Sequence, residues 1–110
     1  MPRGTEIYTF KRDNAIVAIL KEHKGRKNAI KSMVLSNLLR ERGYNLHHTA
    51  IHNVITKLIN ERDLPIVSSA TWGYCWGVTK EDFVIARDEL ISKVEELNRR
   101  IDHYNKFIIN

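Results

Sequence analysis

The sequence has little cysteine and proline and no long apolar run. Its single cysteine, Cys75, cannot form an internal disulfide, and it lacks Cys or His neighbours at the spacing of a structural zinc site. No apolar run approaches the ~20 residues that a membrane span needs, and residues 1–6 do not resemble the start of a secretory signal. We therefore expect an intracellular, cytoplasmic protein without a membrane segment. Its 110 residues suffice for one modest core.

Motifs that carry catalysis are also missing. We find no nucleophile motif, no glycine-rich phosphate loop and no Cys/His metal signature. His48 and His52 have the four-residue spacing of a metal pair, and His47 adds a third nitrogen, but no acidic or Cys ligand stands nearby in the sequence. We expect no enzyme, no bound metal and no cofactor.

What the sequence does have is an uneven excess of positive charge. Residues 1–78 hold 12 Lys and Arg against 6 Asp and Glu, whereas residues 79–110 hold 6 against 7. A basic surplus attracts phosphate backbones through Coulomb forces and counterion release. The first part of the chain is therefore a candidate for nucleic-acid binding, although a merely soluble basic domain has the same signature.

Apolar periodicity and local breakers predict the secondary structure. A first helix is expected between a cap at Asp13 and a stop at Gly25, and a second follows an N-cap at Ser32. A very short strand is expected at 29–31, and a third helix runs from Ala50 to about Arg62, with His48 or Thr49 at its entry. Strands 66–69 and 74–78 form a hairpin. One long helix then starts at Lys80, where Thr79 and Asp82 resemble a capping box. We expect three parts, an N-terminal arm (1–11), a basic domain (12–78) that is the candidate for DNA binding, and a C-terminal helix (79–110) that is the candidate for dimerisation.

The third helix has two chemically different faces. Apolar residues recur at helical spacing from Ile51 to Ile59, which leaves short polar side chains on the opposite face. Such side chains can hydrogen-bond to base edges in a major groove, and lysine or arginine can contact phosphate. The candidate DNA-binding residues are Arg26, Lys27, Lys31, His47, His48, Thr49, His52, Asn53, Thr56, Lys57 and Trp72.

The order helix, short strand, helix, helix, hairpin resembles the winged helix-turn-helix fold over residues 12–78, and above all the short DNA-binding proteins of phages and prophages. The sequence Leu64-Pro65-Ile66-Val67-Ser68-Ser69, followed by Gly73-Tyr74, is similar to the helix exit and wing of those proteins. The resemblance implies a mainly α fold with a small β-hairpin, duplex DNA as partner and a bacterial host cell. The chain departs from it at Asp63, where glycine is common, and at Trp72, which could contact sugars or simply pack.

The C-terminal helix carries a heptad seam. Its apolar residues are Leu90, Val94, Leu97, Ile101, Tyr104 and Ile108, and we expect them to make a homodimer. β-Branched residues at the a positions Val94 and Ile101, with Leu90 and Leu97 at d, favour two parallel strands, and an antiparallel pair remains open. Near the helix start, Phe83 and Ala86 are expected to pack on the chain's own domain.

The sequence thus predicts a sequence-specific transcriptional regulator that binds duplex DNA as a dimer, with the third helix in the major groove. A replication-origin or DNA-packaging protein would share these features. A different kind of function is a protein-interaction module that uses the same faces to bind a protein partner. Such a module need not bind random duplex DNA with salt-dependent affinity.

Overall fold

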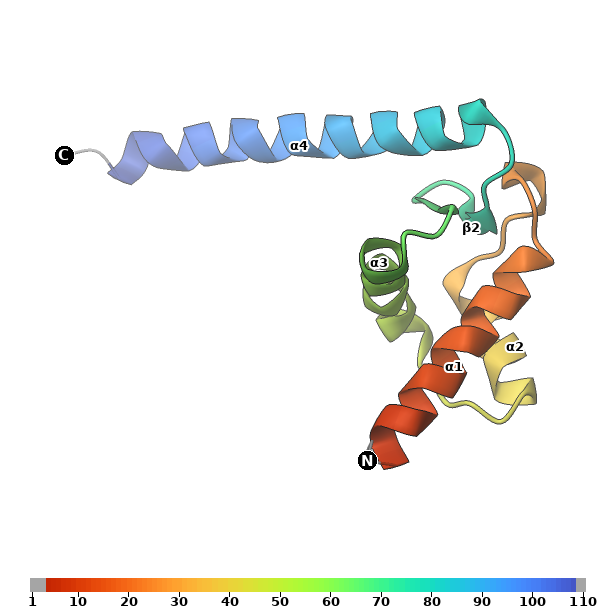
Figure 1. Cartoon of the computed structure of the whole chain (residues 1–110). Coiled ribbons are helices and arrows are strands. Elements are labelled where there is room, and N and C mark those ends of the chain that lie inside the picture. The colour runs from red at the N-terminus through yellow and green to blue at the C-terminus, as the bar shows by residue number, and fades with distance from the viewer. Residues whose placement is uncertain (1–3, 109–110) are drawn as a thin grey trace.

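A computed structural model describes residues 4–108, and these form a mainly helical protein with one small antiparallel hairpin and a long C-terminal helix (Figure 1). The elements are α1 (Gly4–Lys21), the 3₁₀ turn η1 (Arg26–Asn28), α2 (Ser32–Glu41), the 3₁₀ turn η2 (His48–Ala50), α3 (Ile51–Arg62), β1 (Ile66–Ser69), β2 (Gly73–Trp76) and α4 (Lys80–Ile108). The second, third and fourth helices and the hairpin lie within about three residues of their predicted positions. Lys31 occupies the N-cap position of α2 without a side-chain capping hydrogen bond, and the predicted cap Ser32 is the first helical residue.

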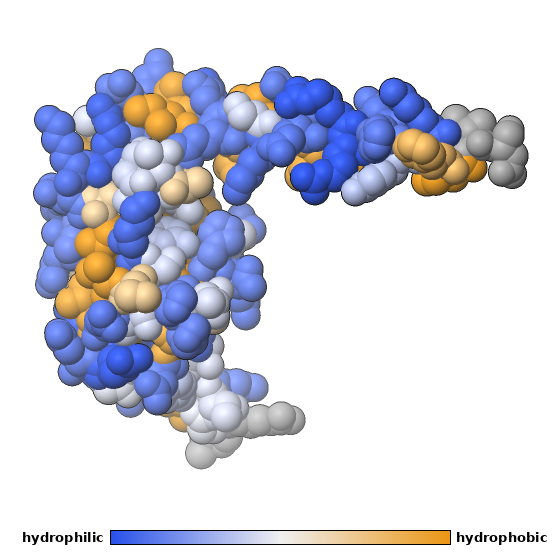
Figure 2. Space-filling model, turned by 180° about the vertical axis from the view of Figure 1, so that it is seen from behind, coloured by the Kyte–Doolittle hydropathy of each residue, from blue (hydrophilic) through white to orange (hydrophobic). Residues whose placement is uncertain are grey.

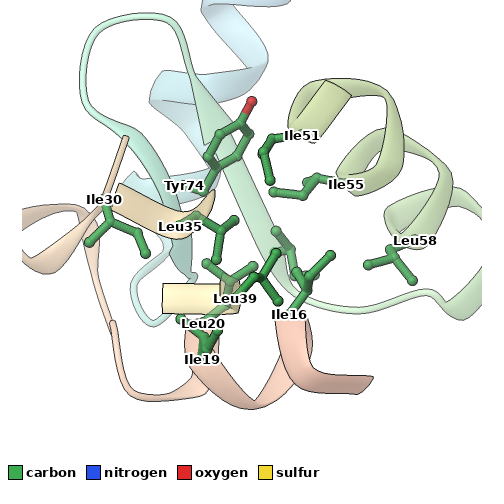
Figure 3. Packing of buried hydrophobic residues seen from close by; sticks show 11 residues of the cluster. Ile16, Ile19, Leu20, Ile30, Leu35, Leu39, Ile51, Ile55, Leu58 and Tyr74 are labelled. Atoms are coloured by element: carbon green, nitrogen blue, oxygen red, sulfur yellow. The ribbon is translucent and has the colours of Figure 1, made fainter. Parts of the chain in front are cut away.

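The core lies where α1, α2, α3 and the hairpin meet (Figure 3). Its buried residues are Ile16, Ile19, Leu20, Ile30, Leu35, Leu39, Ile51, Ile55, Leu58, Ile66 and Tyr74. On α3 the three fully buried residues follow the 3.6-residue helical repeat, so the opposite face of this helix is turned to solvent. The predicted apolar face of α3 is confirmed.

The first helix begins at Gly4, ten residues before the first helical residue expected after a cap at Asp13. Residues 4–11, which were expected to form an arm, belong to α1, and residues 1–3 of that arm lie outside the described residues. Asp13 lies inside the helix, where its carboxylate accepts from the Arg12 guanidinium at 3.1 Å. The early turns have tertiary contacts: the Asn45 N–H donates to the Tyr8 hydroxyl at 2.9 Å, and the Tyr8 and Tyr44 rings lie 5.6 Å apart. Such contacts add to local helix propensity and extend the helix.

The two strands pair antiparallel, with Ile66 opposite Trp76 and Ser69 opposite Gly73. The short strand predicted at 29–31 is reduced to a single bridge, in which the backbones of Ile30 and Tyr74 exchange hydrogen bonds of 2.9 and 2.8 Å. The pairing stops there because α2 begins at Ser32.

The predicted capping box at the start of α4 is confirmed. The Thr79 N–H donates to the Asp82 carboxylate at 3.1 Å, and the Asp82 N–H donates to the Thr79 hydroxyl at 3.3 Å. The first turns of α4 pack on the hairpin, where Ala86 is buried against Val67 and Cys75. From about Leu90 onward the helix stands clear of the body as an arm, giving a molecule of 55 × 36 × 24 Å (Figures 1 and 2).

Candidate nucleic-acid interface

Four predicted site residues share the solvent face of α3. His52, Asn53, Thr56 and Lys57 are all exposed, and they lie opposite the buried Ile51–Leu58 face. The Lys57 ammonium is 4.0 Å from the Glu61 carboxylate, but both side chains are about two-thirds exposed, so this pair is weak. Amide, hydroxyl, imidazole and ammonium groups therefore stand together on one unobstructed helical face.

His47, and not the predicted His48 or Thr49, caps the 3₁₀ turn that leads into α3. The Nδ1 atom of His47 accepts the Thr49 N–H at 3.3 Å and lies 2.9 Å from the Thr49 hydroxyl, which caps η2. The His47 and His48 rings are 4.3 Å apart. Three predicted site residues thus form one compact group at the positive end of α3.

A hollow of about 590 Å³ separates this end of α3 from α4. Lys31 and His52 line it from the body, and Leu90 and Lys93 line it from α4. The Lys31 ammonium donates to the Thr71 backbone oxygen in the hairpin turn, and the Nδ1 atom of His52 is 3.4 Å from the Tyr74 hydroxyl. Side chains therefore link the hairpin turn to the start of α2 and strand β2 to the start of α3.

Two predicted phosphate contacts do not lie with this group. The Arg26 guanidinium donates to Asp82 at 3.1 Å and to Glu81 at 3.2 Å, which ties η1 to the start of α4. Lys27 is exposed in the same turn, which Figure 1 shows in orange beside the start of α4 and away from α3. We leave Arg26 and Lys27 out of the candidate interface.

Trp72 also has a packing role. Its side chain is half-buried against the second apolar cluster, which contains Val67, Cys75 and Ala86. This is the packing alternative of the sequence analysis, and it accounts for a large aromatic residue in the hairpin turn. The ring therefore adds apolar contact to this cluster.

Lys93 is a neighbour of the candidate interface that was not predicted from the sequence. It lies seven residues after the buried Ala86, nearly two turns along α4, so its side chain points toward the same hollow. Helical periodicity could have placed Lys93 there, had α4 been known to pack on the hairpin.

The predicted seam of α4 is uncovered along its whole length. Leu90, Val94, Leu97, Ile101, Tyr104 and Ile108 are between 52% and 70% exposed. Of the residues expected to pack near the helix start, Ala86 is buried, and Phe83 packs its ring over Gly77 while remaining 40% exposed. Monomeric proteins rarely expose so long a contiguous apolar stripe, so this face is a second candidate interaction surface.

Within residues 4–108, no three His, Cys, Asp or Glu side chains are grouped as a metal site would require. None of the helices in that range is long and apolar enough to cross a membrane. Comparisons of the chain with protein-family models, with curated proteins and with solved structures gave no match.

Proposed function

We propose that this chain is a duplex DNA-binding protein of the winged helix-turn-helix type, with α3 in the major groove and the β1–β2 hairpin as the wing. The observation that carries the proposal is the exposed polar face of α3. Asn53 can donate and accept at an adenine edge, and Lys57 can reach guanine or phosphate. Lys31 and the group around His47 would supply the flanking phosphate contacts in this proposal.

The biological role that fits this chemistry best is a transcriptional regulator, and the phage or mobile-element origin rests on the sequence resemblance. Two copies would join through the α4 stripe, so that each dimer presents two third helices. A replication-origin or packaging protein is the second candidate, because the same uncovered stripe could recruit another protein to DNA.

The test is duplex binding measured by fluorescence anisotropy over a range of salt concentrations. Affinity for random duplex should fall steeply with salt. Lys57→Glu should weaken binding and make the salt dependence shallower, by about one unit of log–log slope for each lost phosphate contact.

Lys27→Glu is the matched control, because it changes net charge equally but lies in the η1 turn away from α3. Its effect should be clearly smaller. Equal effects of the two reversals would argue for diffuse attraction and against an α3 interface. Salt-independent or absent binding to random duplex would favour the protein-binding module.

A further inference from the structure

The apolar stripe of α4 lies on the side of the helix that faces the body of the molecule. Ala86 is buried against the hairpin, and Tyr104 follows it by eighteen residues, which is five complete helical turns. The two side chains therefore point in the same direction, and Leu90 and Leu97 lie close to the line that joins them. Figure 2 shows apolar side chains on the side of the arm that faces the angle between arm and body.

This position obstructs a parallel pair. An in-register parallel partner would run its own first turns past Ala86, but the hairpin already occupies that space. The Glu89 carboxylate holds it there, since it accepts from the Ser69 hydroxyl at 2.7 Å and from the Ala70 N–H at 3.2 Å. In a parallel dimer both bodies would compete for the space between the two helices.

The stripe is symmetric when it is read from either end. Its residues are separated by 4, 3, 4, 3 and 4 positions, so the same pattern meets itself when a second helix runs in the opposite direction. Leu90 then packs on Ile108 of the partner subunit, Val94 on the partner's Tyr104, and Leu97 on the partner's Ile101. Each layer combines an a and a d position, as antiparallel coiled coils do.

We propose that two copies of this chain pair through antiparallel α4 helices, and that the last turn of each α4 fills the mouth of the hollow beside α3 in its partner. The inference rests on the proposed self-association of α4. Leu90 lines the hollow, so a partner's Ile108 packed on it lies at the same place. Lys93 lines the hollow from α4 as well, and its ammonium suits the negative end of an incoming helix.

Arg100 flanks the centre of this pair in both chains, which brings two like charges together. The Glu96 carboxylate, 4.0 Å from the Arg100 guanidinium on the same helix, offsets that charge. The charge at the centre of the pair therefore does not oppose the antiparallel arrangement.

Cysteine crosslinking distinguishes the two orientations. The test uses full-length Val94→Cys, Tyr104→Cys and Val94→Cys/Tyr104→Cys proteins, oxidised at neutral pH and micromolar concentration. In the antiparallel pair only the double variant has cysteines that face each other across chains, so it alone should form crosslinked dimers in high yield. Within one chain the two positions are about 15 Å apart, too far for a disulfide. An Arg99→Cys variant, on the opposite face of α4, measures collisional background.

Cys75 does not interfere with the readout, because burial raises the pKa of its thiol to about 11 and the residue is inaccessible to solvent. Efficient crosslinking of both single variants would indicate a parallel pair and overturn the proposal. Crosslinking of no variant above background would overturn it as well. Duplex binding of the same proteins is measured separately, so a failed crosslinking pattern and a failed DNA-binding function are told apart.

Discussion

The carboxylate of Asp82 connects three parts of the chain. It accepts from the backbone N–H groups of Val78 and Thr79 at 3.0 and 3.1 Å, and from Arg26, which lies 56 residues earlier in the sequence. Asp82 is only 2% exposed, so these charge-assisted hydrogen bonds replace its hydration. Its position sets the direction in which α4 leaves the hairpin.

Asp82→Asn should therefore destabilise the protein by about 1–3 kcal/mol at neutral pH, because the amide keeps the shape but loses the charge. The Val78 N–H, together with hydrogen bonds from Thr79 and Arg26, lowers the pKa of Asp82 despite its desolvation. A lowered folded-state pKa stabilises the protein above the unfolded value of about 3.9, and this stabilisation is lost as the pH falls toward the folded-state pKa.

Urea unfolding of the wild type and of Asp82→Asn between pH 7 and pH 3 measures this effect. The difference in free energy of unfolding should shrink below about pH 4. Asp88→Asn is the control, because it makes the same substitution at an exposed position of the same helix. A difference that stays constant with pH would show that the Asp82 charge is not the cause.

At the scale of the elements, the hairpin depends on a close approach at Gly73. This residue has a φ of 96°, and a Cβ atom there would meet the Ile30 carbonyl oxygen at 2.3 Å. The bridge between Ile30 and Tyr74, which joins the hairpin to the start of α2, needs that space.

Gly73→Ala should destabilise the protein by more than the ~1 kcal/mol expected from the positive φ alone. Gly43→Ala is the matched control, since Gly43 has a φ of 89° but nothing lies within 4 Å of its Cβ position. Thermal melts of both variants give the comparison. Equal losses would mean that the bridge adjusts freely and that only backbone strain matters.

The proposed self-association would depend on the exposed stripe of α4. The Leu97→Asp/Ile101→Asp double variant should sediment as a monomer at micromolar concentration while the wild type sediments as a dimer, because carboxylates at the centre of the stripe would be desolvated by pairing. Both positions are more than half exposed in one chain, so the fold itself should be preserved. A monomeric wild type, or a variant that stays dimeric, would refute this assignment.

Local signals could be read from the sequence, and long-range contacts could not. The Thr79/Asp82 capping box spans four residues and was predicted, and the same holds for the apolar spacing of α3 and α4. The early start of α1 depends on contacts such as that between Tyr8 and Asn45, far apart in the chain. Arg26 was predicted to contact phosphate from its charge, because its actual partner Asp82 lies 56 residues later and no local pattern joins the two. Charge alone did not reveal that pairing.

At the scale of the whole molecule, the position of α4 would decide how the two proposed DNA-binding surfaces of a dimer are arranged. The two-fold axis of an antiparallel pair crosses between the helices near the middle of the stripe, perpendicular to both. It places the two bodies at opposite ends of the pair, roughly 50 Å apart along the helix axis at ~1.5 Å per residue. Each body lies on the stripe side of its own α4. The two-fold rotation therefore places the second body on the opposite side of the helix pair from the first.

A dimer on one palindrome instead presents both recognition helices to one face of the duplex, about 34–36 Å apart. The antiparallel dimer should therefore hold two separate duplexes. A duplex of about 40 base pairs fixed to beads, saturated with protein and washed, should capture a second, fluorescent duplex from solution. The monomeric Leu97→Asp/Ile101→Asp variant should bind the fixed duplex but capture no second one. If the wild-type dimer binds the fixed duplex and captures no more free duplex than this variant does, both α3 surfaces must lie on one DNA molecule, and the arrangement inferred from α4 is wrong.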